Sequence, residues 1–425
     1  MRLISAFLSC ALIASLAACG GGGGSDSAAP SSNTSVSSPA SATSNVMAVS
    51  VELGPSNNVN IPYVTVTVCE PGSEVRCRSI DHVLLDTGSN GLRLFASALA
   101  ATSSQSALSF PQLQTGGLAL AECVQFADGS SVWGPVRSAD VKLAGQRVSA
   151  LPVHVVGDAG FAAIPDACSN SLTPATTAAQ FGANGVLGVG TLDQDCGDLC
   201  STTAQNGFYY ACTSSSCSPS TAPLAQQVPN PVARFATDNN GVVVQLPGVA
   251  PGGAATVSGS LIFGIGTQSN NALGSAKVFN LDPASGYFTT IYNNRTYAKS
   301  FIDSGSNAIY FDDAGITICS GYDHGFYCPP FTRNLTATMI GVKVGGASGT
   351  VSFSVANADN LFHANPSFVA FPTLAGPMSG IDNTTPASLW SSYFDWGLPF
   401  FYGRSVFTAI HGRDTPGGKG PYYAY

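Results

Sequence analysis

Two segments of the 425-residue chain repeat one short pattern, and this repetition constrains the fold more than any other feature. Each segment, residues 82–92 and 300–309, has an apolar run, an aspartate, a hydroxyl residue, glycine, serine and asparagine, and then apolar residues again. They hold two Asp-(Ser/Thr)-Gly triplets, which begin at Asp86 and Asp303. The separation, 303 − 86 = 217 residues, suits one triplet in each of two lobes.

The rest of the chain predicts β structure. Only 9% of the residues are charged and 44% are hydrophobic, while 47 glycines divide the sequence into short segments. Runs rich in β-branched and aromatic residues have the length of strands; examples are residues 63–68, 83–85, 153–156, 242–246 and 261–263. We therefore expect an all-β fold of two barrel-like lobes with a cleft between them. The Gly- and Pro-rich stretch 247–253 suggests an N-terminal lobe, 49–247, and a C-terminal lobe, 248–425.

The first residues have the features of an export signal. Residues 1–18 combine a positive start, an apolar stretch and small residues before Cys19. The sequence Leu-Ala-Ala-Cys at 16–19 resembles the lipobox of bacterial lipoproteins, which implies lipidation of Cys19 and a membrane anchor. The alternative is an ordinary secretory signal with a chance cysteine. Residues 19–48 predict a flexible Gly/Ser/Ala/Pro tether.

Gly20 follows the candidate lipidation site. By resemblance to Gram-negative lipoproteins, a glycine there favours sorting to the outer membrane of the bacterial cell envelope. The sequence leaves open which face of that membrane the protein occupies.

Ten cysteines remain when Cys10 and Cys19 are set aside, and an even number in an exported chain predicts disulfides. Neighbours in the sequence suggest the pairs Cys69–Cys77 and Cys319–Cys328, which leaves Cys123–Cys168. Cys196, Cys200, Cys212 and Cys217 can pair in more than one way. A zinc site is the competing interpretation of these four, but their spacing lacks the usual two intervening residues, so we expect no metal.

The two triplets predict acid–base chemistry. Two carboxylates held close together cannot both ionise, so they share one proton over a range of pH. The charged partner can take a proton from water while the protonated partner polarises a carbonyl group. We expect Asp86 and Asp303 to form such a pair and to titrate as a unit. Hydroxyls and glycines beside them can lock the loops together and let N–H groups approach; these supporting residues are Thr87, Gly88, Ser89, Ser304, Gly305 and Ser306.

This arrangement resembles the pepsin-like aspartic proteases. Residues 185–190 and 395–401 look like the family's apolar-apolar-Gly segments, and residues 259–264 and 286–288 precede the second triplet as they do in the family. The resemblance implies the bilobal pepsin fold and an aspartic endopeptidase that hydrolyses extended peptides or proteins without a cofactor. We also expect the chain to belong to an uncharacterised bacterial lipoprotein family.

Residues 125–134 resemble the flap hairpin that closes over the substrate in that family, with a turn at Asp128, Gly129 and Ser130. A plain hairpin with an Asp-Gly turn describes the local sequence equally well. Phe126 replaces the flap tyrosine, and Arg93 stands where the first triplet is usually followed by tryptophan, so the hydrogen bond between those two side chains cannot form. We expect a cation–π contact between Arg93 and Phe126 in its place.

These departures leave a second function open. The alternative is a catalytically inactive pepsin-fold lipoprotein that binds peptides or cell-envelope components, and a self-processing or single-substrate protease is a third possibility. Residues 20–50 contain no Lys or Arg, unlike the basic pro-segments of pepsin-like zymogens. The net charge of −8 and the lack of a basic run argue against a nucleic-acid partner. We expect a monomer.

Overall fold

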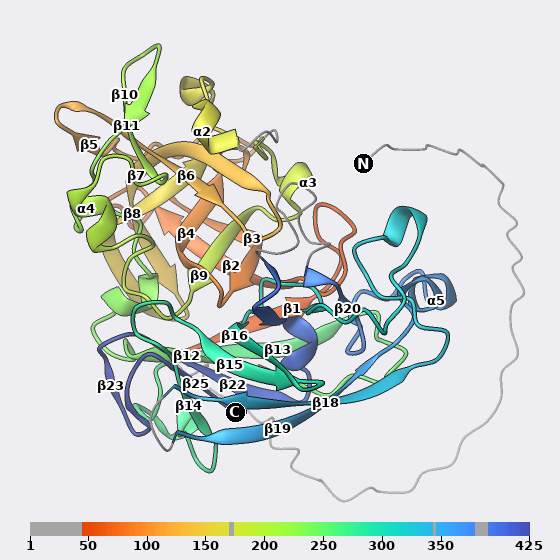
Figure 1. Ribbon diagram of the computed structural model, residues 1–425. Coiled ribbons are helices and arrows are strands. Elements are labelled where there is room, and N and C mark those ends of the chain that lie inside the picture. Colours follow the sequence, from red (N-terminus) through yellow and green to blue (C-terminus); the bar gives the residue numbers. More distant parts are fainter. Residues whose placement is uncertain (1–44, 170–173, 343–345, 379–389) are drawn as a thin grey trace, which may run out of the picture. The chain divides into compact units, whose positions relative to one another are not determined.

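The computed structural model describes residues 45–169, 174–342, 346–378 and 390–425 (Figure 1). The protein is mostly β, with 42% strand, 11% helix and two barrel-like sheets, which confirms the predicted fold class. The predicted signal peptide, Cys19 and most of the predicted tether lie outside the described residues. The first strand already begins at Val46, within the last residues assigned to that tether.

The first sheet runs through most of the chain. Its hydrogen-bonded path is β11-β10-β6-β7-β8-β4-β9-β3-β2-β1-β13-β12-β22-β25-β14, with β5 added on β6. In chain order its strands are β1 (Val46–Val51), β2 (Pro62–Cys69), β3 (Cys77–Asp86), β4 (Asn90–Phe95), β5 (Gln114–Thr115), β6 (Leu118–Gln125), β7 (Ser131–Leu143), β8 (Gln146–Val156), β9 (Gly185–Val189), β10 (Tyr209–Cys212), β11 (Cys217–Pro219), β12 (Gly241–Leu246), β13 (Val257–Phe263), β14 (Val278–Asn280), β22 (Arg404–Ala409) and β25 (Tyr422–Ala424).

The second sheet is formed by the C-terminal half alone, in the order β19-β18-β15-β16-β21-β17-β20. Its strands are β15 (Phe288–Tyr292), β16 (Arg295–Ile302), β17 (Ile309–Tyr310), β18 (Arg333–Ile340), β19 (Ser348–Val355), β20 (Ala375–Gly376) and β21 (Tyr393–Trp396). A separate hairpin pairs β23 (Asp414–Thr415) with β24 (Gly418–Lys419). Figure 1 shows β18 and β19 on the outer side of this half.

Strand β1 joins the two halves of the chain. It pairs antiparallel with β2 on one side and with β13 on the other, in a register that runs from Val46↔Ile262 to Val51↔Val257. The predicted lobe boundary near residue 247 lies between β12 and β13, which are neighbours in the same sheet. That boundary therefore stays a prediction.

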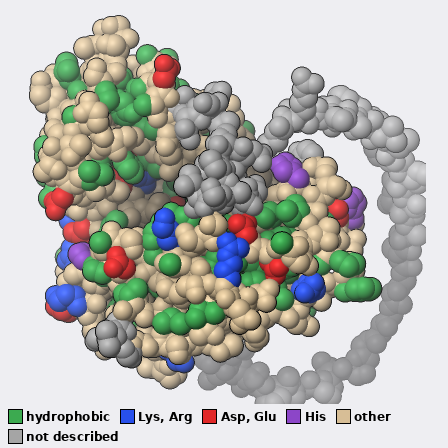
Figure 2. Space-filling view, in the orientation of Figure 1, with side chains coloured by type: hydrophobic (Ala, Val, Ile, Leu, Met, Phe, Trp, Pro, Cys, Tyr) green, Lys and Arg blue, Asp and Glu red, His purple; other side chains and the backbone are tan. Residues whose placement is uncertain are grey.

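The described helices are short. They are α1 (Ala96–Leu99), α2 (Asp166–Ser169), α3 (Ala178–Phe181), α4 (Asp198–Thr202) and α5 (Ala358–Ala364), with 3-10 turns η1 (Ala159–Phe161), η2 (Pro231–Arg234), η3 (Ser269–Asn271), η4 (Gly321–Asp323) and η6 (Leu398–Phe400). Within the described ranges, no helix has the length and apolar character needed to span a membrane. On the face shown in Figure 2, acidic and basic side chains are interspersed.

Five disulfides brace the fold. Cys69–Cys77, Cys123–Cys168 and Cys319–Cys328 pair as predicted. The four cysteines left open pair as neighbours, Cys196 with Cys200 and Cys212 with Cys217. Five disulfides indicate an extracytoplasmic protein, because cytosolic thiols are kept reduced.

In each half of the chain, the triplet stands at the end of a strand that pairs with a parallel neighbour. β3 lies parallel to β9, with Leu84 opposite Val186, and β16 lies parallel to β21, with Phe301 opposite Asp395. Central parallel strands are buried on both faces, so they require nearly continuous apolar runs such as 83–85. The strand ends are therefore rigid, and each aspartate stands where its strand ends.

Candidate active site

The two triplet loops are locked together by reciprocal hydrogen bonds. The Thr87 N–H donates to Ser304 Oγ at 3.1 Å, and the Ser304 N–H donates to Thr87 Oγ1 at 2.9 Å. Each hydroxyl in turn donates to the backbone of the opposite strand, Thr87 to the Ile302 carbonyl at 3.2 Å and Ser304 to the Leu85 carbonyl at 2.7 Å. The N–H and hydroxyl groups of Thr87 and Ser304 thus all have hydrogen-bond partners in the opposite half of the chain. These bonds fix the spacing between the two loops.

The glycines of the triplets allow the two carboxyl groups to approach. A Cβ atom on Gly88 would lie 2.7 Å from both carboxyl oxygens of Asp303, and one on Gly305 would lie 2.8 Å from Asp86 Oδ1. A real Cβ cannot come this close to an oxygen atom. The structure thus brings Asp86 and Asp303 together from positions 217 residues apart (303 − 86), each packed on the other triplet's glycine.

Each carboxyl group is held by donors from its own loop. Asp86 accepts hydrogen bonds from the N–H groups of Gly88 at 2.7 Å and Ser89 at 3.2 Å, and from the Ser89 hydroxyl. Asp303 accepts from the Gly305 N–H at 2.7 Å and the Ser306 hydroxyl at 3.0 Å. All six predicted supporting residues therefore contact the pair or its partner loop.

The environment of the two acids differs. Burial, and then the neighbouring Asp86 and Asp395, raise the pKa of Asp303 well above its usual range. Asp86 accepts one more hydrogen bond than Asp303. The surroundings of Asp303 therefore favour its protonated form.

Cavities flank the pair on both sides of the predicted flap. One, of about 400 Å³, includes Leu84, Phe181 and Tyr310 in its lining, and the other, of about 460 Å³, includes Tyr287, Phe301 and Tyr393. The two linings share Asp86, Asp303, Phe126 and Ala127. The acids therefore lie between two cavities whose linings combine aromatic and polar residues.

Most of the chain matches the model of a known protein family. Residues 41–425 match the family model described as a protein of unknown function, DUF3443. The chain belongs to the DUF3443 family. Among curated proteins, none matches it. The description of the DUF3443 family names no activity.

The predicted flap of the DUF3443 protein is a hairpin between β6 and β7. Its tip is closed by hydrogen bonds from the Phe126 N–H to the Ser130 carbonyl at 2.8 Å and from the Gly129 N–H to the Phe126 carbonyl at 3.0 Å. Gly129 has a φ of 78°, which an L side chain disfavours, and Asp128 accepts from the Ser130 N–H at 2.9 Å. The side chain of Phe126 packs against Phe181, with ring centroids 5.5 Å apart.

The predicted cation–π contact between Arg93 and Phe126 is wrong. Arg93 is 2% exposed, and its guanidinium lies 2.8 Å from a carboxyl oxygen of Glu122 and 3.2 Å from one of Asp195. In the described part of the chain, the cation–π contacts belong to Arg295, Lys299 and Arg404. A guanidinium buried beside two carboxyl groups gains more from them than from a ring face, because opposite charges attract strongly away from water.

This ion pair has a structural consequence for the flap. Glu122 lies on β6, the strand that leads into the hairpin, and Arg93 lies on β4, the strand that follows the Asp86 loop. Burial works to raise the pKa of Glu122, but Arg93 and then His154 outweigh it, so this pKa is lowered. Glu122 is thus ionised, and Arg93 anchors the base of the flap.

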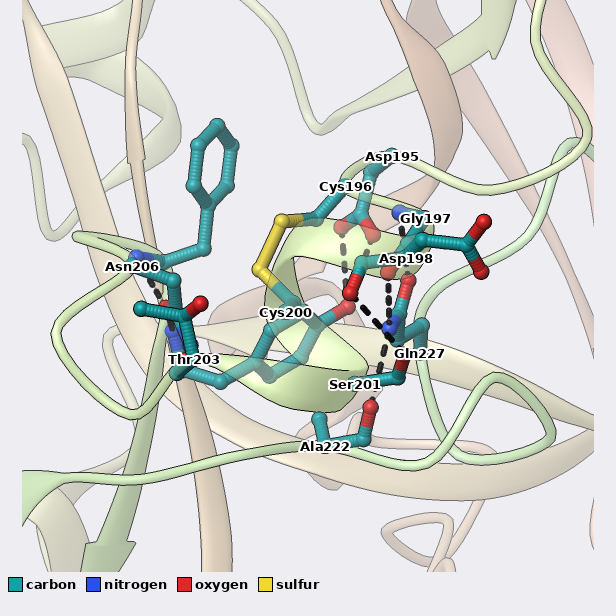
Figure 3. The surroundings of a disulfide bond; sticks show 12 residues. Asp195, Cys196, Gly197, Asp198, Cys200, Ser201, Thr203, Asn206, Ala222 and Gln227 are labelled. Carbon is teal, nitrogen blue, oxygen red and sulfur yellow. Dashed lines mark hydrogen bonds between the residues drawn. A yellow bond between two sulfur atoms is a disulfide. The ribbon is translucent and has the colours of Figure 1, made fainter.

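Asp195 is held in place by a compact turn (Figure 3). The side chain of Gln227 donates to the Gly197 carbonyl at 2.8 Å and accepts from the Gly197 N–H at 2.7 Å, and the Cys196–Cys200 disulfide closes the same turn. Tyr209 donates its hydroxyl to Asp195 at 2.8 Å. Burial and the neighbouring Glu122 raise the pKa of Asp195 well above its usual range.

Four buried residues of this cluster could not be assigned a role from the sequence, namely Glu122, His154, Asp195 and Tyr209. Each is a single polar residue without a motif, and its partners are distant in the sequence. The signal that could have been used is Arg93 itself, a cation within an apolar strand, which requires a buried counter-charge.

One group of three possible metal ligands occurs in the described ranges, namely Cys319, Cys328 and Asp359. Both sulfur atoms are joined in a disulfide, so neither is available as a thiolate ligand. This group does not fit a metal centre.

Proposed function

We propose that this DUF3443 protein is an aspartic endopeptidase, with Asp86 and Asp303 as its catalytic pair. The observation that carries the proposal is the reciprocal packing of each carboxyl group on the other triplet's glycine, braced by the Thr87–Ser304 hydrogen bonds. A purely structural pair of acids would be separated or matched with cations, since two neighbouring carboxyl groups oppose each other's ionisation.

The reaction follows from the unequal protonation of the pair. Ionised Asp86 takes a proton from a water molecule, whose oxygen bonds to the carbonyl carbon of the peptide. Asp303 gives its proton to the carbonyl oxygen, which yields a tetrahedral intermediate with two hydroxyl groups. The C–N bond then breaks as the leaving nitrogen takes the proton from Asp86 and one hydroxyl of the intermediate returns a proton to Asp303, so that the pair regains its starting state. The hydrolysis needs no metal or cofactor.

The shape of the cleft supports an extended peptide as the substrate. Cavities of about 400 and 460 Å³ continue on both sides of the acids, so chain can extend in both directions from the scissile bond. Aromatic residues in both linings favour apolar side chains. We expect cleavage within a chain rather than at its end, by a monomer.

The same proposal includes an anchor at Cys19 in the bacterial cell envelope, in keeping with the extracytoplasmic location that the disulfides indicate. Labelled palmitate should be incorporated into the protein and lost in Cys19→Ala. Incorporation that survives in this variant would rule out lipidation at Cys19.

The test of activity uses protein made in an oxidising compartment, incubated with an unfolded protein substrate between about pH 3 and 7, with and without pepstatin. We expect cleavage that is lost in both Asp86→Asn and Asp303→Asn and is kept in Asp414→Asn, an exposed acid outside the cleft. Cleavage that survives either of the first two substitutions would contradict the proposal.

A peptide-binding protein without activity is the second candidate, and one observation favours it. Phe126 has no hydroxyl group, whereas the flap residue of pepsin-like proteases is a tyrosine. Unfolded protein that binds at every pH but is never cut would support this binder.

A further inference from the structure

A third cavity adjoins one of the two that flank the acids. It has a volume of about 520 Å³, and its lining shares Asn58 and Asn307 with the cavity of about 400 Å³ that Asp86 and Asp303 help to line. Asn307 stands only four residues after Asp303 (307 − 303 = 4), in the loop of the second triplet. A ligand that reaches the acids can therefore continue past these two asparagines into the third cavity.

The walls at this junction are fixed by Asn60, which is fully buried and has a φ of 55°, a value that asparagine tolerates better than most residues. Its side-chain nitrogen donates to the carbonyl groups of Asn307 at 2.8 Å and Phe371 at 2.9 Å, and its side-chain oxygen accepts from the Phe371 N–H at 2.7 Å. The Asn60 N–H donates to the carbonyl of Val369, which lines the cavity, at 2.6 Å. The third cavity is thus preformed and holds one position relative to the loop of the second triplet.

Two aromatic rings form part of the apolar lining of the third cavity. Phe326 lies in the loop that the Cys319–Cys328 disulfide closes, and Phe362 lies on α5. The two rings have centroids 5.8 Å apart, and both residues are only partly buried. Leu53, in the same lining, is 55% exposed. Large apolar side chains left open in a concave site are typical of a surface that binds a ligand.

The polar part of the lining indicates what kind of ligand fits. The Tyr310 hydroxyl donates to Asn307 Oδ1 at 2.6 Å, so the side-chain nitrogen of Asn307 remains to donate to a ligand. Asn58, at the same junction, is exposed. Amide side chains match both the N–H and the C=O groups of a peptide backbone, whereas a hydrocarbon tail would leave them without partners. The combination of amide and aromatic groups therefore fits an extended peptide with a large apolar side chain.

We propose that the third cavity binds a large apolar side chain of the peptide substrate, beyond the residues that contact the acids, and that Phe326 and Phe362 determine this preference. The inference rests on the proposed function, because the ligand is the substrate of the same site. It narrows the substrate class to long, extended segments that carry such a side chain on one side of the scissile bond. Binding energy from this remote contact adds to kcat/KM, so short peptides are poor substrates.

The test uses peptides with one cleavage site, lengthened one residue at a time on either side and ending in phenylalanine or in serine. We expect kcat/KM to rise about tenfold at one length, on one side only and only with phenylalanine, because the ring leaves water when it enters the cavity. The ratio of kcat/KM between long and short peptides should fall to about one in Phe362→Ala. It should also be smaller in Leu53→Ala, whose exposed side chain is not needed for folding.

Phe331→Ala is the matched control, because Phe331 is 81% exposed and lines none of the three cavities. This variant should keep the wild-type ratio. A ratio that stays unchanged in both Phe362→Ala and Leu53→Ala would overturn the inference. An equal rise when an alkyl chain replaces the added residues would also overturn it, since the cavity would then bind a hydrocarbon tail.

A second measurement does not depend on cleavage. Binding of the same peptides, labelled with a fluorophore, is followed by polarisation in Asp303→Asn. The long peptide that ends in phenylalanine should bind about tenfold more tightly than the short one, and this difference should disappear in the double variant Asp303→Asn with Phe362→Ala. Such a difference in a protein whose wild type cuts nothing would keep the third cavity as a peptide site and refute the endopeptidase. Cleavage with equal affinity for both lengths would keep the endopeptidase and overturn this inference.

Discussion

Arg93 Nη2 lies 2.8 Å from Glu122 Oε1, and this buried ion pair joins the strand after the Asp86 loop to the strand that enters the flap. Both side chains are at most 2% exposed. In the pepsin-like proteases, which the two triplet segments resemble, the flap is held by a tyrosine–tryptophan hydrogen bond. Here the link is made at the base of the hairpin, which leaves Phe126 at its tip free to pack against Phe181.

Arg93→Met should destabilise the protein by about 3–5 kcal/mol, because it leaves the ionised Glu122 buried without its cation. Denaturant unfolding measures this difference. The control is Lys419→Met, which removes the exposed ion pair with Asp414 and should cost less than about 1 kcal/mol. Equal losses of unfolding free energy in the two variants would show that the buried Arg93–Glu122 pair contributes no more to stability than an exposed ion pair.

The double variant Arg93→Trp with Phe126→Tyr introduces the two residues that the sequence resemblance to pepsin-like proteases leads one to expect at these positions. We expect it to lower stability rather than improve activity, since tryptophan cannot neutralise Glu122. Thermal unfolding measured beside a peptidase assay tests this. Higher activity at undiminished stability would mean that the charge of Arg93 is not needed beside Glu122 and that only its packing matters.

Gly305→Ala places a methyl group 2.8 Å from Asp86 Oδ1, so either the loop or the carboxyl group must move. We expect a loss of about 1–3 kcal/mol in stability, as for other overpacked sites, and loss of activity. Gly248→Ala is the matched control, because nothing lies within 4 Å of its Cβ position. If both variants unfold at the same temperature, the close packing of the triplets is not as described.

Thr87→Val and Ser304→Ala each remove a hydroxyl that both donates and accepts between the loops. Each should cost about 1–3 kcal/mol, because a buried N–H group and a buried carbonyl lose their partner. The double variant should cost less than the sum of the two, since the hydroxyls form one network. Strict additivity in a double-mutant cycle would contradict the reciprocal bracing.

His154 makes stability depend on pH. Burial first, and then the nearby Arg93, lower its pKa to about 4 against the opposing effect of Glu122. The unfolded chain therefore binds a proton below about pH 6.5 that the folded protein takes up only near pH 4. The free energy of unfolding is therefore highest above pH 6.5, where His154 is neutral in both states. It falls by about 3 kcal/mol as the pH decreases towards 4.

His154→Gln should remove this dependence from urea unfolding curves measured across that range, while the exposed His411→Gln should leave it unchanged. A wild-type difference that persists in His154→Gln would assign the dependence to other groups.

The sequence was sufficient for the features that local chemistry determines. Asp86 and Asp303 were found because the whole loop pattern is repeated around them, and Cys69–Cys77 because close neighbours leave few other partners. It was insufficient for Glu122 and Asp195, whose role exists only once folding brings them to Arg93.

Strand β1 also dictates when this protein can fold. Its partner β13 begins at Val257, more than 200 residues after Val46 (257 − 46 = 211), so the side of β1 that faces β13 remains unpaired until most of the polypeptide has followed. Contacts between such distant segments form slowly, because a long loop must close before any pairing stabilises it. A nascent chain halted before β13 would expose the free edge of β1, which can pair with strands of other chains, and we expect such truncated products to depend on holding chaperones.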